Sequence, residues 1–284
     1  MRLSRFAILG VAVTAMVGCS EPSDGPTTPN TPPLAFVRYI NAVPDTLNTT
    51  VRFIDQVEYS PISFANVPFR GQGQGSYQPT AAGARKFRVF TADAVNFSTA
   101  GNTAILVDTT ITFEAGKYYT LLHLGYARAG SAPKQRIVAI NDVFPASAAG
   151  ISVRAIHAGL DVGNVDIYAT ATTTDAITGA PLLANVALNT VSAYLARATG
   201  AFAARVTTPG STEAVISAAA PAGTAGSASV DPIGGATIAG SIITAIAFPA
   251  SPQLPAAPSA GAKFAAPGVS YFVDKQPPRT TPNP

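Results

Sequence analysis

Residues 37–42 read Val-Arg-Tyr-Ile-Asn-Ala, and residues 153–158 read Val-Arg-Ala-Ile-His-Ala. Both stretches contain β-branched residues, which favour strands, and each is followed at the same spacing by an aspartate, Asp45 and Asp161. The second stretch repeats the first 116 residues later along the chain. A repeat at this spacing indicates two copies of one strand-forming unit.

Further short matches extend the repeat along the chain, always in the same order. They pair Asn48 with Asn164, 64–67 with 183–186, Tyr77 with Tyr194, Gly83 with Gly200, 88–89 with 205–206, 115–120 with 239–244, and 140–142 with 272–274. Their spacing drifts from 116 to 132 residues, as insertions accumulate in the second copy. We therefore predict two units, residues 34–144 and 150–275, joined by a linker at 145–149.

Each unit consists of short segments rich in Val, Ile, Phe, Tyr and Thr, bounded by Gly, Pro, Asn or Asp. In the first unit the predicted strands are 36–42, 50–56, 85–91, 105–113, 117–125 and 136–141, with a tight turn at 114–117. No window has a convincing helical period. About seven short strands per unit predict an all-β fold of two tandem immunoglobulin-like antiparallel β-sandwich domains.

The N-terminus has the pattern of an exported protein. Two positive charges precede an apolar run at 6–17, which is too short to cross a bilayer as a helix. The run ends in Met16-Val17-Gly18-Cys19, which resembles the lipobox of bacterial lipoproteins. The resemblance implies that residues 1–18 are a signal peptide, that Cys19 is the lipidated first residue of the mature protein, and that acyl chains such as palmitate hold it to a membrane.

Two further segments lie outside the repeated units. Residues 19–33, rich in Pro, Ser and Thr, are predicted to be a tether, and residues 276–284 a Pro-rich tail. By analogy with enteric lipoproteins, Ser20 after the lipidated cysteine favours the outer membrane over the inner membrane of the cell envelope. A Pro/Ala-rich insertion at 249–267 interrupts the last hairpin of the second unit, where the first unit has the shorter loop 126–134.

Composition excludes several functions. Charged residues make up 12% of the chain, and removal of Arg2 and Arg5 with the signal leaves 16 basic against 15 acidic residues. Without a Lys/Arg cluster there is no electrostatic basis for nucleic-acid binding. The single cysteine can form neither an internal disulfide nor a thiolate metal site, and no cofactor is expected.

Few residues are candidates for a chemical site. Asp45 and Asp161, repeated together with Asn48 and Asn164, are weak candidates for a Ca²⁺ site. Turn capping at the end of a strand explains them better, because a dense carboxylate cluster is absent. Asp166, in the strand that follows in the second unit, is predicted to face solvent.

The remaining candidates do not predict an enzyme. His123 and His157 each occur in one unit only, which excludes a repeated histidine site. No nucleophile elbow, zinc motif or phosphate-binding loop is present, and the Gly-rich stretch 71–75 is predicted to be a turn rather than a ligand loop. We therefore predict no catalytic residue.

Taken together, the repeated motifs resemble the bacterial family called domain of unknown function 4397. The resemblance rests on residues 37–45 and 153–161, on Val-Asp-Ile-Tyr at 165–168, on 82–89 and on Ala-Gly-Lys-Tyr-Tyr-Thr at 115–120. The second element is degraded at 49–52. The resemblance implies a sandwich fold, an envelope location and tandem copies, but no activity and no catalytic residue.

These observations favour a non-enzymatic envelope lipoprotein that binds, adheres or scaffolds, with a membrane anchor and an envelope protein or glycan as partner. A hydrolase or accessory domain acting on an envelope polymer is the alternative. A cleft with polar residues around His123 or His157 would favour the hydrolase. A third possibility, a plain spacer, predicts neither pocket nor partner.

Overall fold

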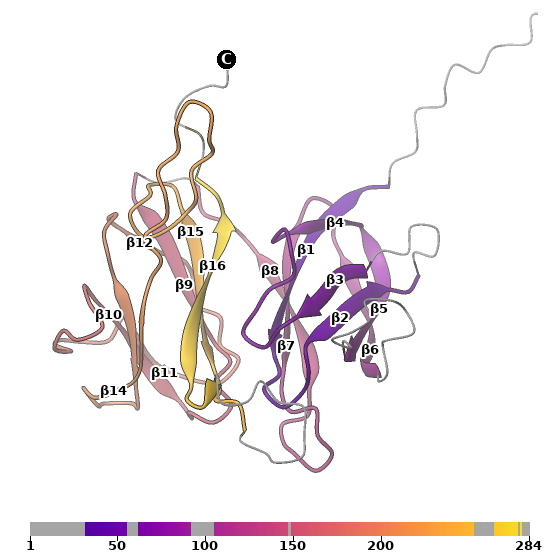
Figure 1. The fold of residues 1–284 in the computed structure, drawn as a ribbon, viewed down its shortest axis with the longest axis horizontal. Coiled ribbons are helices and arrows are strands. Elements are labelled where there is room, and N and C mark those ends of the chain that lie inside the picture. Colours follow the sequence, from indigo (N-terminus) through magenta and orange to yellow (C-terminus); the bar gives the residue numbers. More distant parts are fainter. Residues whose placement is uncertain are drawn as a thin grey trace, which may run out of the picture. The chain divides into compact units, whose positions relative to one another are not determined.

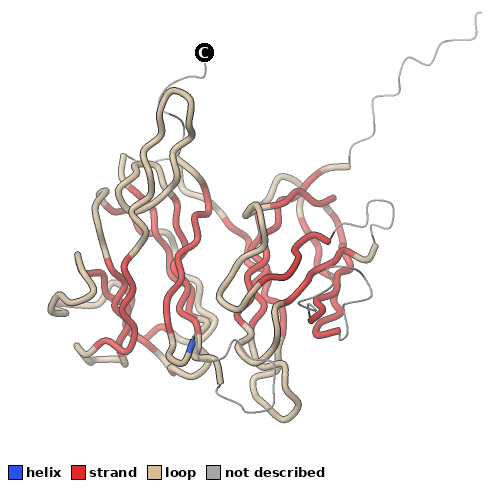
Figure 2. Tube along the Cα trace, viewed as in Figure 1, coloured by secondary structure: helices blue, strands red, loops and turns tan. Residues whose placement is uncertain are grey.

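The computed structural model describes residues 32–55, 62–91, 105–146, 149–252, 264–277 and 279. The predicted signal peptide, Cys19 and nearly all of the tether lie outside these residues, as do residues 253–263 of the predicted insertion. Residues 33–284 form one compact unit. The regular structure of the described ranges is almost entirely β-strand, with a short helical turn at Phe264 (Figure 2). No helix in these ranges has the length and hydropathy needed to span a membrane.

In the part of the chain that the structure describes, eight strands build the first sandwich (Figure 1). They are β1 (Leu34–Ala42), β2 (Thr49–Phe53), β3 (Ile62–Val67), β4 (Gln78–Ala81), β5 (Gly83–Thr91), β6 (Ile105–Phe113), β7 (Tyr118–Leu124) and β8 (Arg136–Asp142). One sheet has the order β4-β1-β7-β8 and the other the order β3-β2-β5-β6.

Eight further strands build the second sandwich in the same way. They are β9 (Ile151–His157), β10 (Val165–Thr170), β11 (Leu183–Val186), β12 (Leu195–Arg197), β13 (Ala203–Thr207), β14 (Ala214–Ala219), β15 (Ile242–Phe248) and β16 (Gly268–Lys275). Their sheets have the orders β12-β9-β15-β16 and β11-β10-β13-β14. The chain is therefore all-β, with two tandem immunoglobulin-like sandwiches, as predicted.

One pairing in each sandwich differs from the predicted antiparallel pattern. β1 pairs with β7 in parallel, and β9 pairs with β15 in parallel. All other strand pairs are antiparallel. A parallel pair needs a long connection, which here is the chain between the first and seventh strands of the sandwich, so it leaves no local trace in the sequence.

The predicted turn at 114–117 is confirmed. Lys117 N donates to Glu114 O, and Gly116 has a φ of +74°. Gly116 N also donates to Leu34 O at the start of β1. The turn joins β6 in one sheet to β7 in the other, so it forms an edge of the sandwich and not a hairpin within one sheet.

The described residues of the first sandwich form an aromatic-rich core between its sheets. Its buried members are Ala35, Val37, Tyr39, Val51, Phe53, Phe64, Val67, Phe87, Val89, Phe113, Tyr119 and Leu121. Strand alternation sends every second residue of β1 into this core and the residues between them to the opposite face. That opposite face carries the site described next.

Candidate functional site

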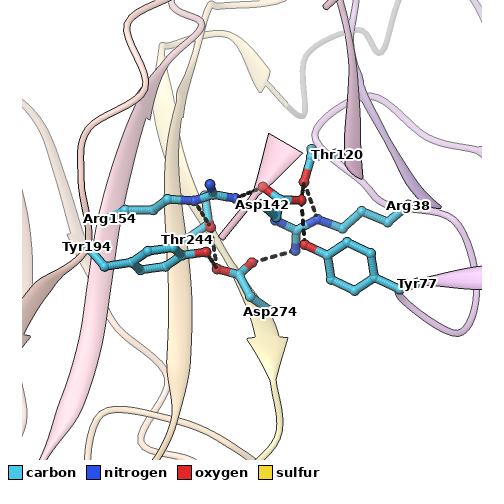
Figure 3. A network of polar contacts seen from close by, with 8 residues as sticks. All are labelled: Arg38, Tyr77, Thr120, Asp142, Arg154, Tyr194, Thr244 and Asp274. Atoms are coloured by element: carbon cyan, nitrogen blue, oxygen red, sulfur yellow. Dashed lines mark hydrogen bonds and ion pairs between the residues drawn. The ribbon is translucent and has the colours of Figure 1, made fainter. Parts of the chain in front are cut away.

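A network of eight polar side chains joins the two sandwiches (Figure 3). The first sandwich supplies an Arg, a Tyr, a Thr and an Asp, and the second supplies the same four types from matching positions of the repeat. The residues are Arg38, Tyr77, Thr120 and Asp142 in the first, and Arg154, Tyr194, Thr244 and Asp274 in the second.

The two arginines are exchanged between the sandwiches. Arg154 Nη2 donates to Asp142 Oδ1 at 2.5 Å, and Arg38 Nη1 lies 2.6 Å from Asp274 Oδ1. All four side chains are at most 3% exposed. Each sandwich thus provides one cation and one anion, and each ion finds its partner in the other sandwich.

Within each sandwich the same contacts hold the ions in place. Arg38 Nε donates to Thr120 Oγ1 at 2.8 Å, and both the Thr120 hydroxyl (2.6 Å) and the Tyr77 hydroxyl (2.7 Å) donate to Asp142 Oδ2. The Arg38 guanidinium also lies over the Tyr77 ring, 4.8 Å from its centroid. Carboxylates with several donors are strong, oriented acceptors.

The second sandwich reproduces these contacts. Arg154 Nε donates to Thr244 Oγ1 at 2.8 Å, and the Thr244 (2.5 Å) and Tyr194 (2.7 Å) hydroxyls donate to Asp274 Oδ2. The Arg154 guanidinium lies 4.8 Å from the centroid of the Tyr194 ring. The network therefore has an internal two-fold pattern.

Strand register explains why the sequence produces this arrangement. Arg38 on β1 is the direct partner of Thr120 on β7, and Arg154 on β9 is the direct partner of Thr244 on β15. Directly opposed residues share a face of the sheet. An apolar cluster continues that face with side chains from both sandwiches: Ile40, Ala42, Phe69, Leu122, Leu124, Ile140, Ile156, Ala158, Ile246, Phe248 and Phe272.

Burial and charge act in opposite directions on the arginines. Desolvation lowers the pKa of Arg38, but the Asp274 carboxylate raises it, and the net direction is upward. The pKa of Arg154 is likewise lowered by burial and raised, in net terms, by Asp142. Burial also raises the pKa of Tyr77 and Tyr194. Both arginines therefore keep their charge in spite of burial, as suits a structural connection.

The structure gives Asp45 and Asp161 a role that differs in detail from local turn capping. Both Asp45 oxygens accept backbone N–H groups, of Ala127 and Arg128, from the loop after β7. Asp161 accepts from Ala250 N after β15. The two aspartates therefore cap a distant loop, because the parallel pairing brings the end of the first strand beside the end of the seventh. No group of three or more His, Cys, Asp or Glu suited to a metal ion occurs in the described ranges.

The repeated asparagines hold a bulge in each sandwich. Asn48 Nδ2 donates to Asn66 Oδ1 at 2.9 Å, and Asn164 Nδ2 donates to Asn185 Oδ1 at 3.0 Å. Asn66 and Asn185 have φ values of 51° and 49°, in the left-handed region that asparagine tolerates. These matches of the repeat are therefore explained by backbone geometry.

The prediction that Asp166 faces solvent was wrong. Asp166 is 5% exposed and accepts from Asn185 N at 2.6 Å and Gly210 N at 2.8 Å. These amides lower the pKa of its carboxyl group. In the first sandwich Thr50 Oγ1 accepts from Asn66 N. A threonine hydroxyl there and the Asp166 carboxylate here thus bind the backbone amide of equivalent asparagines.

Both histidines are buried inside the strand framework. His123 Nδ1 lies 2.7 Å from Tyr39 OH and its Nε2 lies 3.0 Å from Gln135 Oε1. Desolvation lowers the pKa of His123 to about 4. His157 Nε2 lies 2.6 Å from Gly163 O, and burial lowers its pKa. Their ring nitrogens are thus engaged by neighbouring groups of the fold.

The predicted turn in the Gly-rich stretch 71–75 packs against the first strand. Asn41 N donates to Gly71 O, and Gly73 N donates to Tyr39 O. A Cβ at Gly73 would lie 2.1 Å from Phe64 Cδ1, so a side chain there would collide with the core. Glycine is therefore required by packing at this position.

All eight residues of the network lie at matched positions of the repeat, but the sequence pattern did not predict that they contact one another. The nearest clue was charge: Arg38, Arg154, Asp142 and Asp274 lie within strands of a chain that has few charges. Charged residues in strands that are otherwise buried indicate mutual pairing.

Comparison with known families matches part of the chain. Residues 35–168 match the family model described as Domain of unknown function (DUF4397), from β1 to the Val-Asp-Ile-Tyr stretch of β10. No curated protein matches the chain significantly. Residues 35–168, which are 134 of the 284 residues of the chain, are thus similar to the family of domain of unknown function 4397 (DUF4397), as the motifs predicted.

Proposed function

We propose that this chain is a lipid-anchored protein of the bacterial cell envelope that acts by binding or scaffolding and not by catalysis. The observation that carries the non-catalytic part is the eight-residue network. It gathers buried ions, hydroxyls and phenols in one place, yet these groups bond to one another across the two sandwiches. Side chains that bond to one another in this way connect domains, and this supports a structural role for the network rather than a catalytic one.

The network supports a scaffolding role in mechanical terms. Two sandwiches joined only by the few residues between Asp142 and Ile151 would reorient freely, whereas buried ion pairs fix one orientation. A body of two sandwiches with one orientation presents its loops at fixed spacing to an envelope protein or glycan. The lipobox and the Pro-rich tether support placement beside a membrane, with the outer membrane favoured by Ser20.

Intact mass and detergent partitioning test the anchor. In the native host the mature protein should begin at Cys19 and carry the added mass of acyl chains. Cys19→Ser should lose that mass and keep residues 1–18, because a hydroxyl cannot replace the thiol in the lipid-transfer step. An unmodified wild-type chain, or one that begins at another residue, contradicts the anchor.

Spin labels test the scaffold independently of the anchor. The exposed residues Lys117 and Thr208 lie on different sandwiches and can be replaced by labelled cysteines in a chain whose one native cysteine is Cys19, here Cys19→Ser. A single narrow distance distribution is expected. Arg38→Met combined with Arg154→Met should broaden it. A broad distribution in the unmodified body contradicts a fixed scaffold.

A further inference from the structure

The second sandwich contains a cavity of about 280 Å³ between its two sheets. Small or aliphatic residues provide most of the lining: Val153, Ala155, Ile167, Ala169, Leu182, Leu183, Leu195, Ala196, Ala204 and Ala245. Arg154, Tyr168, Arg197 and Phe202 complete it. A cavity of this size in a sandwich core is unusual, because protein interiors are packed as densely as organic crystals.

Repeat positions show how the cavity arises. In β1 and β7 of the first sandwich, Tyr39 is the partner of Leu121, while in the second sandwich Ala155 is the partner of Ala245. At the equivalent pair in the opposite sheets, Phe53 faces Phe87 in the first sandwich, and Ala169 faces Ala204 in the second.

The first sandwich fills this space completely. Tyr39, Phe53, Phe87 and Leu121 are at most 6% exposed and belong to one continuous core. The four alanines that replace them all line the cavity. Three aromatic rings and one isobutyl group are thus missing from the second sandwich at positions that the first sandwich uses for its core.

The surrounding structure has not collapsed into the space. The core of the second sandwich is divided into two separate clusters, one around Ile167 and Val206 and one around Ile151 and Phe202. Val153 and Ala155 are half-buried, although their counterparts Val37 and Tyr39 are fully buried. The cavity is therefore reachable from outside.

An edge of the sandwich provides the opening. β11 and β12 each form one edge of a sheet. Leu182, just before β11, and Leu195, on β12, are 50% and 36% exposed although they line the cavity. On β12, Arg197 has a buried Nε that has no hydrogen-bond partner among the described residues. Its guanidinium rests 4.9 Å from the centroid of the Phe202 ring. The other arginine of the lining, Arg154, is bonded to Thr244 and Asp142. A mainly apolar chamber with one incompletely bonded cation favours an apolar ligand with an acidic group.

We propose that the second sandwich binds an aliphatic carboxylic acid of about eight to ten carbons, with its chain in the cavity and its carboxylate on Arg197. The volume is about twice the ~150 Å³ of a cavity that holds benzene. An alkyl chain is favoured over an aromatic ring as the apolar part of the ligand because the lining is mainly aliphatic. In addition, the Phe202 ring is already in contact with Arg197 and Tyr271. The proposal does not depend on the membrane anchor.

Calorimetric titration with sodium decanoate tests the proposal. The chain from residue 19 with Cys19→Ser retains every described residue and needs no detergent. One site is expected, with a rise in the melting temperature at saturating ligand. Ala204→Phe and the milder Ala245→Leu restore the residue types of the first sandwich and should each weaken binding at least tenfold. The matched control Ala84→Phe, at an exposed position of β5, should bind as the parent does.

The role of Arg197 and the role of the ligand's alkyl chain are tested separately. Arg197→Gln should weaken decanoate at least tenfold and leave the neutral alcohol 1-decanol unchanged. The proposal is overturned if decanoate does not bind, or if it binds equally to folded Ala204→Phe and Ala245→Leu proteins. Tighter binding of 2-naphthoate than of decanoate overturns the aliphatic assignment. The spin-label and mass measurements do not change with any of these results, so the two proposals fail separately.

Discussion

Replacement of Arg38 by Met should destabilise the protein far more than loss of a surface arginine. The guanidinium lies 2.6 Å from the Asp274 carboxylate, and both side chains are fully buried. At that separation an effective dielectric constant of ~20 gives an attraction of about 6 kcal/mol, which is an upper limit because desolvation offsets part of it. Loss of one partner of a buried pair costs about 3–5 kcal/mol, and we expect a loss in that range.

Urea unfolding followed by far-ultraviolet circular dichroism measures this loss. Arg38→Met, Asp274→Leu and the double variant form a cycle in which the double variant should be at least 2 kcal/mol more stable than the two single losses predict, since it leaves no unpaired ion. Arg85→Met is the matched control. Its ion pair with Asp55 is part-exposed at 3.1 Å, so its loss should stay below about 1 kcal/mol.

Two results would refute this reasoning. If Arg38→Met costs no more than Arg85→Met, the buried pair does not hold the sandwiches together. If the two single losses simply add, Arg38 and Asp274 act independently of each other. The network also couples the sandwiches, so the single variants should separate one unfolding transition into two.

Three other predictions concern the interiors of the sandwiches. The pKa of His123 is about 4 in the fold against 6.5 in the unfolded chain, so folding favours the neutral imidazole. The free energy of unfolding should therefore be highest above pH 6.5 and fall by about 3 kcal/mol as the pH drops to 4. His123→Gln should flatten this pH dependence in urea unfolding at several pH values. Phe87→Ala should cost about 3–5 kcal/mol in thermal or urea unfolding because it opens a void in a filled core, whereas Ala204→Phe at the equivalent position should cost less than 1 kcal/mol; equal losses would contradict the cavity. Asn185→Ala should cost about 1–2 kcal/mol, because it loses the bond from Asn164 at a φ of 49°, and Thr212→Ala, at an exposed position, should change little by the same measurement.

Much of the fold could be predicted because it depends on local pattern. The predicted strand at 36–42 corresponds to β1, that at 105–113 to β6, and the predicted turn at 114–117 lies at an edge of the sandwich. Apolar alternation and turn residues are read within a few positions of the chain, and a repeat doubles every observation.

The candidate site could not be predicted to the same degree, because it depends on contacts across long sequence separations. A repeat shows that Arg38 and Arg154 are equivalent, but not that each contacts the aspartate of the other sandwich. Strand alternation predicts which face of the sheet carries Asp166, and that face was expected to be open to solvent. It does not show that the backbone at Asn185 and Gly210 covers Asp166. The cavity likewise required the strand registers, since an alanine in a strand leaves a void only where no other side chain enters.

The exchange of arginines has a consequence for how the two sandwiches depend on each other. When each partner gives and receives the same contact, the surface is self-complementary, as in symmetric dimers. Here the partners are covalently joined, so their effective concentration is in the millimolar range and independent of how dilute the protein is. A sandwich with a poorly filled interior can then be stabilised by its contacts with the better-packed sandwich. This coupling is compatible with an internal chamber in the second sandwich, because the contacts with the first sandwich offset part of the packing that the chamber costs.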